Sequence, residues 1–230
     1  MRYVLGSRAG IGGVLGSGRG GAAAAWYLAG GVSAANCIAA YTPKGAASLA
    51  ASYDNNAAPG NGLADGTYDA APGVAPTFDT ATGWTFAAAS SQYLATGVTP
   101  ANSGWSFVLR YVSNSDGVLC GCGTPPDNMF HWQRYAGAMY YANGTYTATA
   151  GDFSGTMAIA GLNGYRDGSF DKAIGTAWSG AAGIFTIGAV ARTSGNITLF
   201  SSVEVAAVAI YNTTLTAPQV AAISSAMSLL

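Results

Sequence analysis

The chain has 230 residues, half of them hydrophobic, which suits one domain with a sizeable core or one domain with an extension. Charged residues make up only 8% and the net charge is −1, so the sequence offers no basic patch for the phosphates of a nucleic acid. Because so few charges leave a surface of small polar and aromatic residues, the composition favours a protein of a large assembly or of the outside of a cell.

Residues 1–33 form a Gly/Ala-rich segment that carries no charge after Arg19. It is too rich in glycine and polar residues to be a membrane-spanning helix. We predict an arm whose apolar residues bind neighbouring subunits, and the alternative is a secretory signal cleaved after a V-x-A site at 32–34. The arm residues are Tyr3, Val4, Leu5, Val14, Leu15, Trp26, Tyr27 and Leu28.

The arm also contains a match to the dinucleotide-binding pattern G-x-G-x-x-G, at Gly16–Gly21. A dinucleotide site of this kind needs a βαβ unit and an acidic residue about 20 residues further on. The first carboxylate after this pattern is Asp54, and the sequence that follows is rich in strand-forming residues. We therefore attribute the match to the density of glycine.

After a loop predicted over residues 55–83, short β-branched and aromatic runs alternate with turn residues almost to the end of the chain. This spacing predicts an all-β, antiparallel jelly-roll sandwich over residues 34–230. Asn143–Gly144 predicts a type I′ hairpin turn between two aromatic runs. The last run predicts a short helix, with Thr216 as its N-cap and Gln219 completing a capping box.

The three cysteines, Cys37, Cys120 and Cys122, have no disulfide-framework spacing. A zinc site would need further ligands, and the chain has a single histidine, His131. We predict buried free thiols.

Several short stretches resemble the laminin-G and concanavalin A-like jelly-roll family. They are NGYRDGSFDK at 163–172, IFTIGA at 184–189, VEVAAVAIYN at 203–212 and LTAPQVAAIS at 215–224. The resemblance covers residues 37–228 and implies the sandwich fold with a short C-terminal helix. The Ala-rich segment over residues 26–86 also resembles structural proteins of tailed bacteriophages, which implies a place in a virion.

Hydrolases of this fold family commonly carry E-x-D-x-x-E on one strand. Glu204 is the only glutamate of this chain, and Ala206 stands where the motif requires an acid. His131, Arg134 and Tyr135 form a candidate set for a polysaccharide lyase, but such a trio also suits a packed strand. We predict that the protein is not an enzyme.

The family also includes calcium-binding and glycan-binding members. Asp152 and Asp167 are candidate calcium ligands, although Asp167–Gly168 also suits a tight turn. Sugar rings stack on exposed aromatic side chains, and alternation along a strand turns one of two neighbouring tyrosines outward. The candidate glycan-binding or partner-binding residues are Trp132, Tyr135, Tyr140, Tyr141 and Tyr165.

The leading prediction is a non-enzymatic structural protein of a phage virion, either a head decoration or a tail or fibre component. Its partners would be other virion proteins, further copies of itself and a cell-surface glycan. No cofactor or metal is predicted, and Asp152 and Asp167 are only candidate calcium ligands. The alternative is a secreted laminin-G-like lectin, and a weaker one is a polysaccharide lyase or hydrolase.

Overall fold

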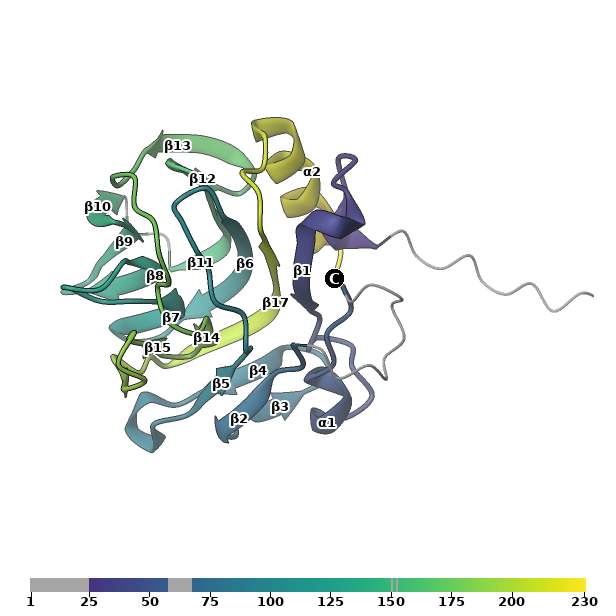
Figure 1. The fold of residues 1–230 in the computed structure, drawn as a ribbon. Helices are drawn as coiled ribbons and strands as arrows, with labels where there is room; N and C mark the ends of the chain where they lie inside the picture. The colour runs from purple at the N-terminus through teal and green to yellow at the C-terminus, as the bar shows by residue number, and fades with distance from the viewer. Residues whose placement is uncertain (1–24, 58–67, 150, 152) are drawn as a thin grey trace, which may run out of the picture.

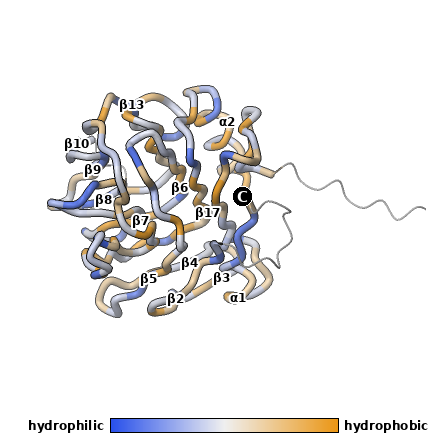
Figure 2. The backbone as a smooth tube through the Cα atoms, viewed as in Figure 1, coloured by the Kyte–Doolittle hydropathy of each residue, from blue (hydrophilic) through white to orange (hydrophobic). Residues whose placement is uncertain are grey.

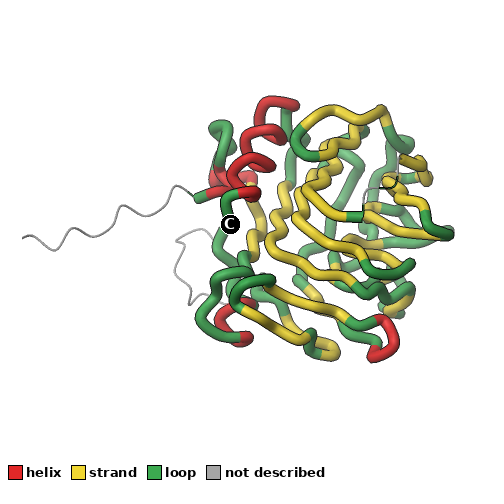
Figure 3. The backbone as a smooth tube through the Cα atoms, turned by 180° about the vertical axis from the view of Figure 1, so that it is seen from behind, coloured by secondary structure: helices red, strands yellow, loops and turns green. Residues whose placement is uncertain are grey.

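The computed structural model describes residues 25–57, 68–149, 151 and 153–230, and it contains two β-sheets packed face to face (Figure 1). Neighbouring strands run antiparallel, except where β15 meets β7. The all-β sandwich predicted from the sequence is confirmed. Figure 3 shows from behind the strands of the sandwich side by side, with the longest helix on one side.

The first sheet has the order β13-β12-β11-β6-β17-β4-β3, and β1 pairs with β17 beside β4. Its strands are β1 (Cys37–Tyr41), β3 (Thr77–Asp79), β4 (Gly83–Phe86), β6 (Ser106–Ser113), β11 (Ser154–Ala160), β12 (Asn163–Arg166), β13 (Ser169–Ala173) and β17 (Val203–Tyr211).

The second sheet has the order β10-β9-β8-β7-β14-β5-β2, and β15 connects β16 to β7. Its strands are β2 (Ala71–Val74), β5 (Tyr93–Ala95), β7 (Gly117–Cys122), β8 (Phe130–Tyr135), β9 (Ala138–Asn143), β10 (Thr145–Thr149), β14 (Thr186–Ile187), β15 (Val190–Ala191) and β16 (Ile197–Thr198).

The main core lies between the sheets and is rich in aromatic rings. Phe107 of β6 meets Phe130 of β8 edge to face with 5.0 Å between ring centroids, and it meets Phe185 at 5.2 Å. Figure 2 shows hydrophobic residues along β6, β7 and β17, in the middle of the molecule. Strand alternation turns every second residue of these strands into this space, which selects the apolar set.

A second core lies on the outer face of the first sheet, beneath α2 (Ala217–Ser228). Val220, Ile223 and Met227 of α2 pack there against small residues of the sheet. The predicted start of this helix is confirmed, because the side-chain oxygen of Gln219 accepts the backbone N–H of Thr216 at 3.0 Å. The other helices are α1 (Leu49–Ser52), η1 (Trp26–Leu28), η2 (Ala34–Asn36) and η3 (Ala88–Ser90).

The predicted arm divides at the edge of the described residues. Tyr3, Val4, Leu5, Val14 and Leu15 lie outside them. Trp26 and Tyr27 are buried in the second core beside α2, and Leu28 packs at its margin. Trp26 donates from Nε1 to the Thr42 hydroxyl at 2.8 Å. The prediction that these residues contact a neighbouring subunit is therefore corrected, because their own domain holds them.

All three cysteines are buried and free, as predicted. Burial raises the pKa of each thiol. Within the described ranges, no helix combines the length and apolar character needed to cross a bilayer.

Candidate functional site

A groove of about 420 Å³ opens on the outer face of the second sheet, away from the main core. Three tyrosines from three successive strands line it: Tyr135 of β8, Tyr140 of β9 and Tyr146 of β10. Gln133 and Leu199 complete the lining. We call it the tyrosine groove.

Strand register places these side chains together. On β8, alternation points His131, Gln133 and Tyr135 outward, while Trp132 between them enters the core. Gln133 pairs with Tyr140 across the β8–β9 ladder, so one polar and one aromatic side chain share the floor. The three β8 residues therefore share the outer face of the second sheet.

The tyrosines contact one another through their ring edges. The centroids of Tyr135 and Tyr140 are 6.5 Å apart, and those of Tyr140 and Tyr146 are 6.3 Å apart at an interplanar angle of 85°. Tyr135 is 62% exposed and Tyr146 is 41% exposed. Mutual contact therefore orders the rings while ring surface remains open to solvent.

His131 supports this groove from below. Ala142 pairs with both His131 and Tyr146 in the two flanking ladders, and its small side chain lets the Tyr146 ring reach the imidazole at 5.6 Å. Nδ1 of His131 lies 3.4 Å from the Cys122 carbonyl oxygen, and Nε2 lies 3.3 Å from Oε1 of Gln133. Burial lowers the pKa of His131 to about 4, because desolvation disfavours the imidazolium, so the ring is neutral at pH 7.

The structure brings together two of the five predicted glycan-binding or partner-binding residues, Tyr135 and Tyr140. Trp132 and Tyr141 are fully buried in the main core, 4.6 Å apart. Tyr165 is buried in the second core, on the other sheet. These three are corrected: strand alternation turns Trp132 and Tyr141 into the main core, and Tyr165 is buried in the cluster beneath α2.

Tyr146 is not among the site residues selected from the sequence, and the predicted turn would have placed it on the wrong face. A type I′ turn at Asn143–Gly144 would pair Ala142 with Thr145 and place Tyr146 opposite the inward-facing Tyr141. The structure pairs Tyr146 with Ala142 instead, which puts its ring on the outer face. The hairpin is confirmed, but the turn type is wrong, since φ is positive at Gly144 and not at Asn143.

The physical reason lies in the side chain of Asn143. This residue is buried, donates from Nδ2 to the Gly161 carbonyl at 2.6 Å and accepts a hydrogen bond from Nε1 of Trp178. These bonds need an inward-facing residue in extended backbone. No local turn signal could have indicated them.

The proposed lyase trio does not converge. His131 is buried and Tyr135 is exposed on the outer face of β8. Arg134 points to the other face, where it forms an ion pair with Asp116 at 3.3 Å and lies over the Phe153 ring.

The two candidate calcium ligands are Asp152 and Asp167. Asp152 lies outside the described residues. Asp167 occupies the predicted Asp167–Gly168 turn at φ 46°, and its carboxylate accepts the Thr156 N–H at 2.8 Å. Across the described part of the chain, no three His, Cys, Asp or Glu side chains gather as metal ligands would.

No family model and no curated protein matches this chain. Solved structures do resemble it. A mutant of Trypanosoma rangeli sialidase that displays trans-sialidase activity has a TM-score of 0.57 at 15% identity. The match covers 85% of this chain and 34% of that one. The same sialidase in complex with sialic acid has a TM-score of 0.52 at 14% identity, over 83% of this chain and 33% of that one.

The receptor-binding domain of botulinum neurotoxin type G has a TM-score of 0.55 at 10% identity, and the match covers 83% of this chain and 51% of that domain. This chain thus spans about a third of the sialidase chains and about half of the neurotoxin domain. At these identities the likeness establishes the β-sandwich fold and nothing finer.

The likeness also corrects the prediction that the protein is not an enzyme. That prediction depended on the absence of one glycosidase motif. Two of the structures that share this fold belong to a sialidase, which is an enzyme. The absence of one glycosidase motif is therefore not sufficient reason to classify a sandwich of this kind as non-enzymatic.

Proposed function

We propose that this protein is a carbohydrate-binding β-sandwich module whose tyrosine groove stacks a sugar. The observation that carries the proposal is the cluster of Tyr135, Tyr140 and Tyr146 around one open groove. Sugar rings present apolar C–H faces that pack on aromatic rings, and the Gln133 amide on the floor supplies hydrogen-bonding atoms for hydroxyls. A few polar groups within a mainly apolar lining are typical of a ligand site.

The structural neighbours support the proposal in a general way. A sialidase that was solved with sialic acid and a neurotoxin receptor-binding domain both contain this fold. Fold alone does not assign a ligand, so the argument for this chain depends on the groove.

A glycan array followed by calorimetry on the strongest hit tests the proposal. We expect Tyr146→Ala to weaken binding about tenfold or more, because it removes a stacking ring. Tyr146→Phe should retain most of the affinity, since the ring remains. Phe170→Ala is a matched control, because Phe170 is 57% exposed on the other sheet. If every glycan bound equally well after Tyr146→Ala and Tyr135→Ala, the groove would not be the site.

A virion location, as a head decoration or a tail or fibre component, stays a prediction from the sequence, with secretion as the alternative. It is compatible with a glycan-binding module, since a module displayed on a particle can contact a cell-surface glycan. Sedimentation of the native material separates the two locations: co-migration with particles supports the virion, and a free monomer supports secretion.

A further inference from the structure

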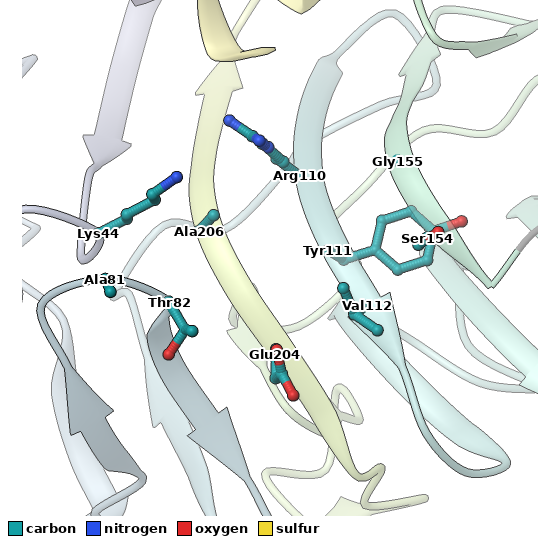
Figure 4. A pocket seen from close by; sticks show the side chains of 10 residues that line it. All are labelled: Lys44, Ala81, Thr82, Arg110, Tyr111, Val112, Ser154, Gly155, Glu204 and Ala206. Atoms are coloured by element: carbon teal, nitrogen blue, oxygen red, sulfur yellow. The ribbon is translucent and has the colours of Figure 1, made fainter. Parts of the chain in front are cut away.

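A second groove, of about 310 Å³, lies on the outer face of the first sheet, on the opposite side of the sandwich from the tyrosine groove (Figure 4). It crosses β11, β6 and β17 and is bordered by the loop that follows β1. Three charged residues line it: Lys44, Arg110 and Glu204. The chain has only nine basic residues, so two in one groove is a concentration of charge.

A bulge in β17 shapes the floor. The β6–β17 pairing shifts register between Val205 and Ala207, so Ala206 is an extra residue at the centre of the sheet. The bulge keeps Val205 and Val208 facing the main core on either side of it. The methyl side chain of Ala206 leaves space above the strand, and a larger side chain at this position would fill that space.

Backbone contacts hold Lys44 at the rim. Its N–H donates to the Ala206 carbonyl at 3.4 Å, and the next N–H, of Gly45, donates to the Thr80 carbonyl at 2.7 Å. The segment after β1 is thereby fixed above the bulge. The Lys44 side chain extends from this rim toward Arg110 (Figure 4).

Arg110 approaches from the opposite side. It projects outward from β6, and its guanidinium donates to the Met227 carbonyl near the C-terminal end of α2. This hydrogen bond uses one of the five N–H donors of the Arg110 guanidinium and fixes the position of the guanidinium beside the groove. The ammonium of Lys44 and this guanidinium extend toward each other (Figure 4), and neither forms an ion pair with an acidic residue of the described ranges.

Two converging cations repel each other, and an anion between them relieves that repulsion. Glu204 lies farther along β17 and points away from the pair (Figure 4). With one acid and two bases, the groove has a net charge of +1, which matches a single negative charge. The hydroxyls of Thr82 and Ser154, with the Glu204 carboxylate, suit a ligand rich in hydroxyl groups.

We propose that this groove binds one monoanionic sugar residue of the uronic acid class. Its carboxylate lies between Lys44 and Arg110, and its hydroxyls face Glu204, Thr82 and Ser154. The volume is at the small end of the range for ligand sites, which suits one ring. The proposal is independent of the tyrosine groove, which lies on the other sheet.

The test is a titration of the full chain, at low salt, with methyl β-D-glucuronide and with the neutral methyl β-D-glucoside, followed by amide NMR shifts. Low salt is needed because the charges are partly exposed. We expect saturable shifts at Lys44, Glu204 and Ala206 with the glucuronide only. Lys44→Gln should weaken its binding about tenfold, because a charge-assisted contact is lost, while Lys172→Gln on β13 leaves it unchanged.

Glu204→Gln distinguishes binding from a merely structural role. We expect it to tighten glucuronide binding a few-fold, because a repelling carboxylate becomes neutral. Tyr146→Ala should leave this titration unchanged, so the two grooves are tested separately. Equal affinity for the neutral glucoside, or unchanged glucuronide affinity in Lys44→Gln, would overturn the proposal.

Discussion

The two neighbouring tyrosines of β9 illustrate how much one residue position decides. Tyr141 is fully buried between the sheets, and a side chain at Gly164 would collide with its ring at 2.6 Å. Tyr140, one residue earlier, lines the tyrosine groove. The two residues are chemically identical, so only the pleat of the strand assigns one to the core and the other to the surface.

His131 gives a pH prediction at the same scale. Its pKa is about 4 in the folded chain and about 6.5 when unfolded, because burial disfavours the charged ring. Its stabilising contribution is therefore complete above pH 6.5 and is lost as the pH falls toward 4. We expect the free energy of unfolding to drop by about 2 kcal/mol between pH 7 and pH 5 from this residue.

Urea unfolding at both pH values, on the wild type and on His131→Gln, measures this effect. The variant has no imidazole to protonate. Its free energy of unfolding should therefore fall by about 2 kcal/mol less than that of the wild type between pH 7 and pH 5. An equal pH response in the two proteins would show that His131 does not titrate as its burial implies.

At the scale of elements, the β9–β10 hairpin determines the tyrosine groove. Gly144 has φ 72°, and a Cβ there would lie 2.4 Å from the Thr176 carbonyl oxygen. The turn is therefore both left-handed and closely packed. Because a register slip of one residue would turn Tyr146 inward, the groove depends on this turn.

We predict that Gly144→Ala destabilises the protein by about 3 kcal/mol, of which about 1 kcal/mol is left-handed backbone strain and the rest is displacement of the neighbouring backbone. Gly137→Ala is a matched control, since Gly137 has φ 73° and nothing lies within 4 Å of its Cβ position. Gly137→Ala should lower the free energy of unfolding only by the backbone strain of about 1 kcal/mol. Urea unfolding of both variants decides the matter, and equal losses would mean that the contact with Thr176 is unimportant.

At the scale of the whole molecule, residues near the start of the described chain are held by residues near its C-terminal end. Tyr211, near the end of β17, donates to the Tyr27 carbonyl at 2.9 Å, and Trp26 packs against Tyr27 edge to face. Residues 25–41 thus lie beside α2, and both ends of the described chain meet on one face (Figure 1).

We predict that Trp26→Ala lowers the free energy of unfolding by about 3 kcal/mol, because it empties a buried aromatic site and removes a hydrogen bond to Thr42. Leu28→Ala, at the margin of the same cluster, should cost about 1 kcal/mol. Chemical denaturation measures both. A loss at Trp26 no larger than at Leu28 would mean that this segment does not stabilise the sandwich.

The sequence determined the features that depend on local pattern. Alternating apolar residues specified strands, and Thr216 with Gln219 specified the start of α2. The same alternation predicted that one of Tyr140 and Tyr141 faces solvent, but it did not decide which of the two.

Only the tertiary structure decided the features that depend on contacts between distant residues. Asn143 is drawn inward by Gly161 and Trp178, which sets the hairpin register and brings Tyr146 into the tyrosine groove. Lys44 and Arg110 are 66 positions apart, and they line one groove because β1, β6 and β17 share one sheet. Such long-range contacts decide where side chains gather, and no local pattern in the sequence contains them.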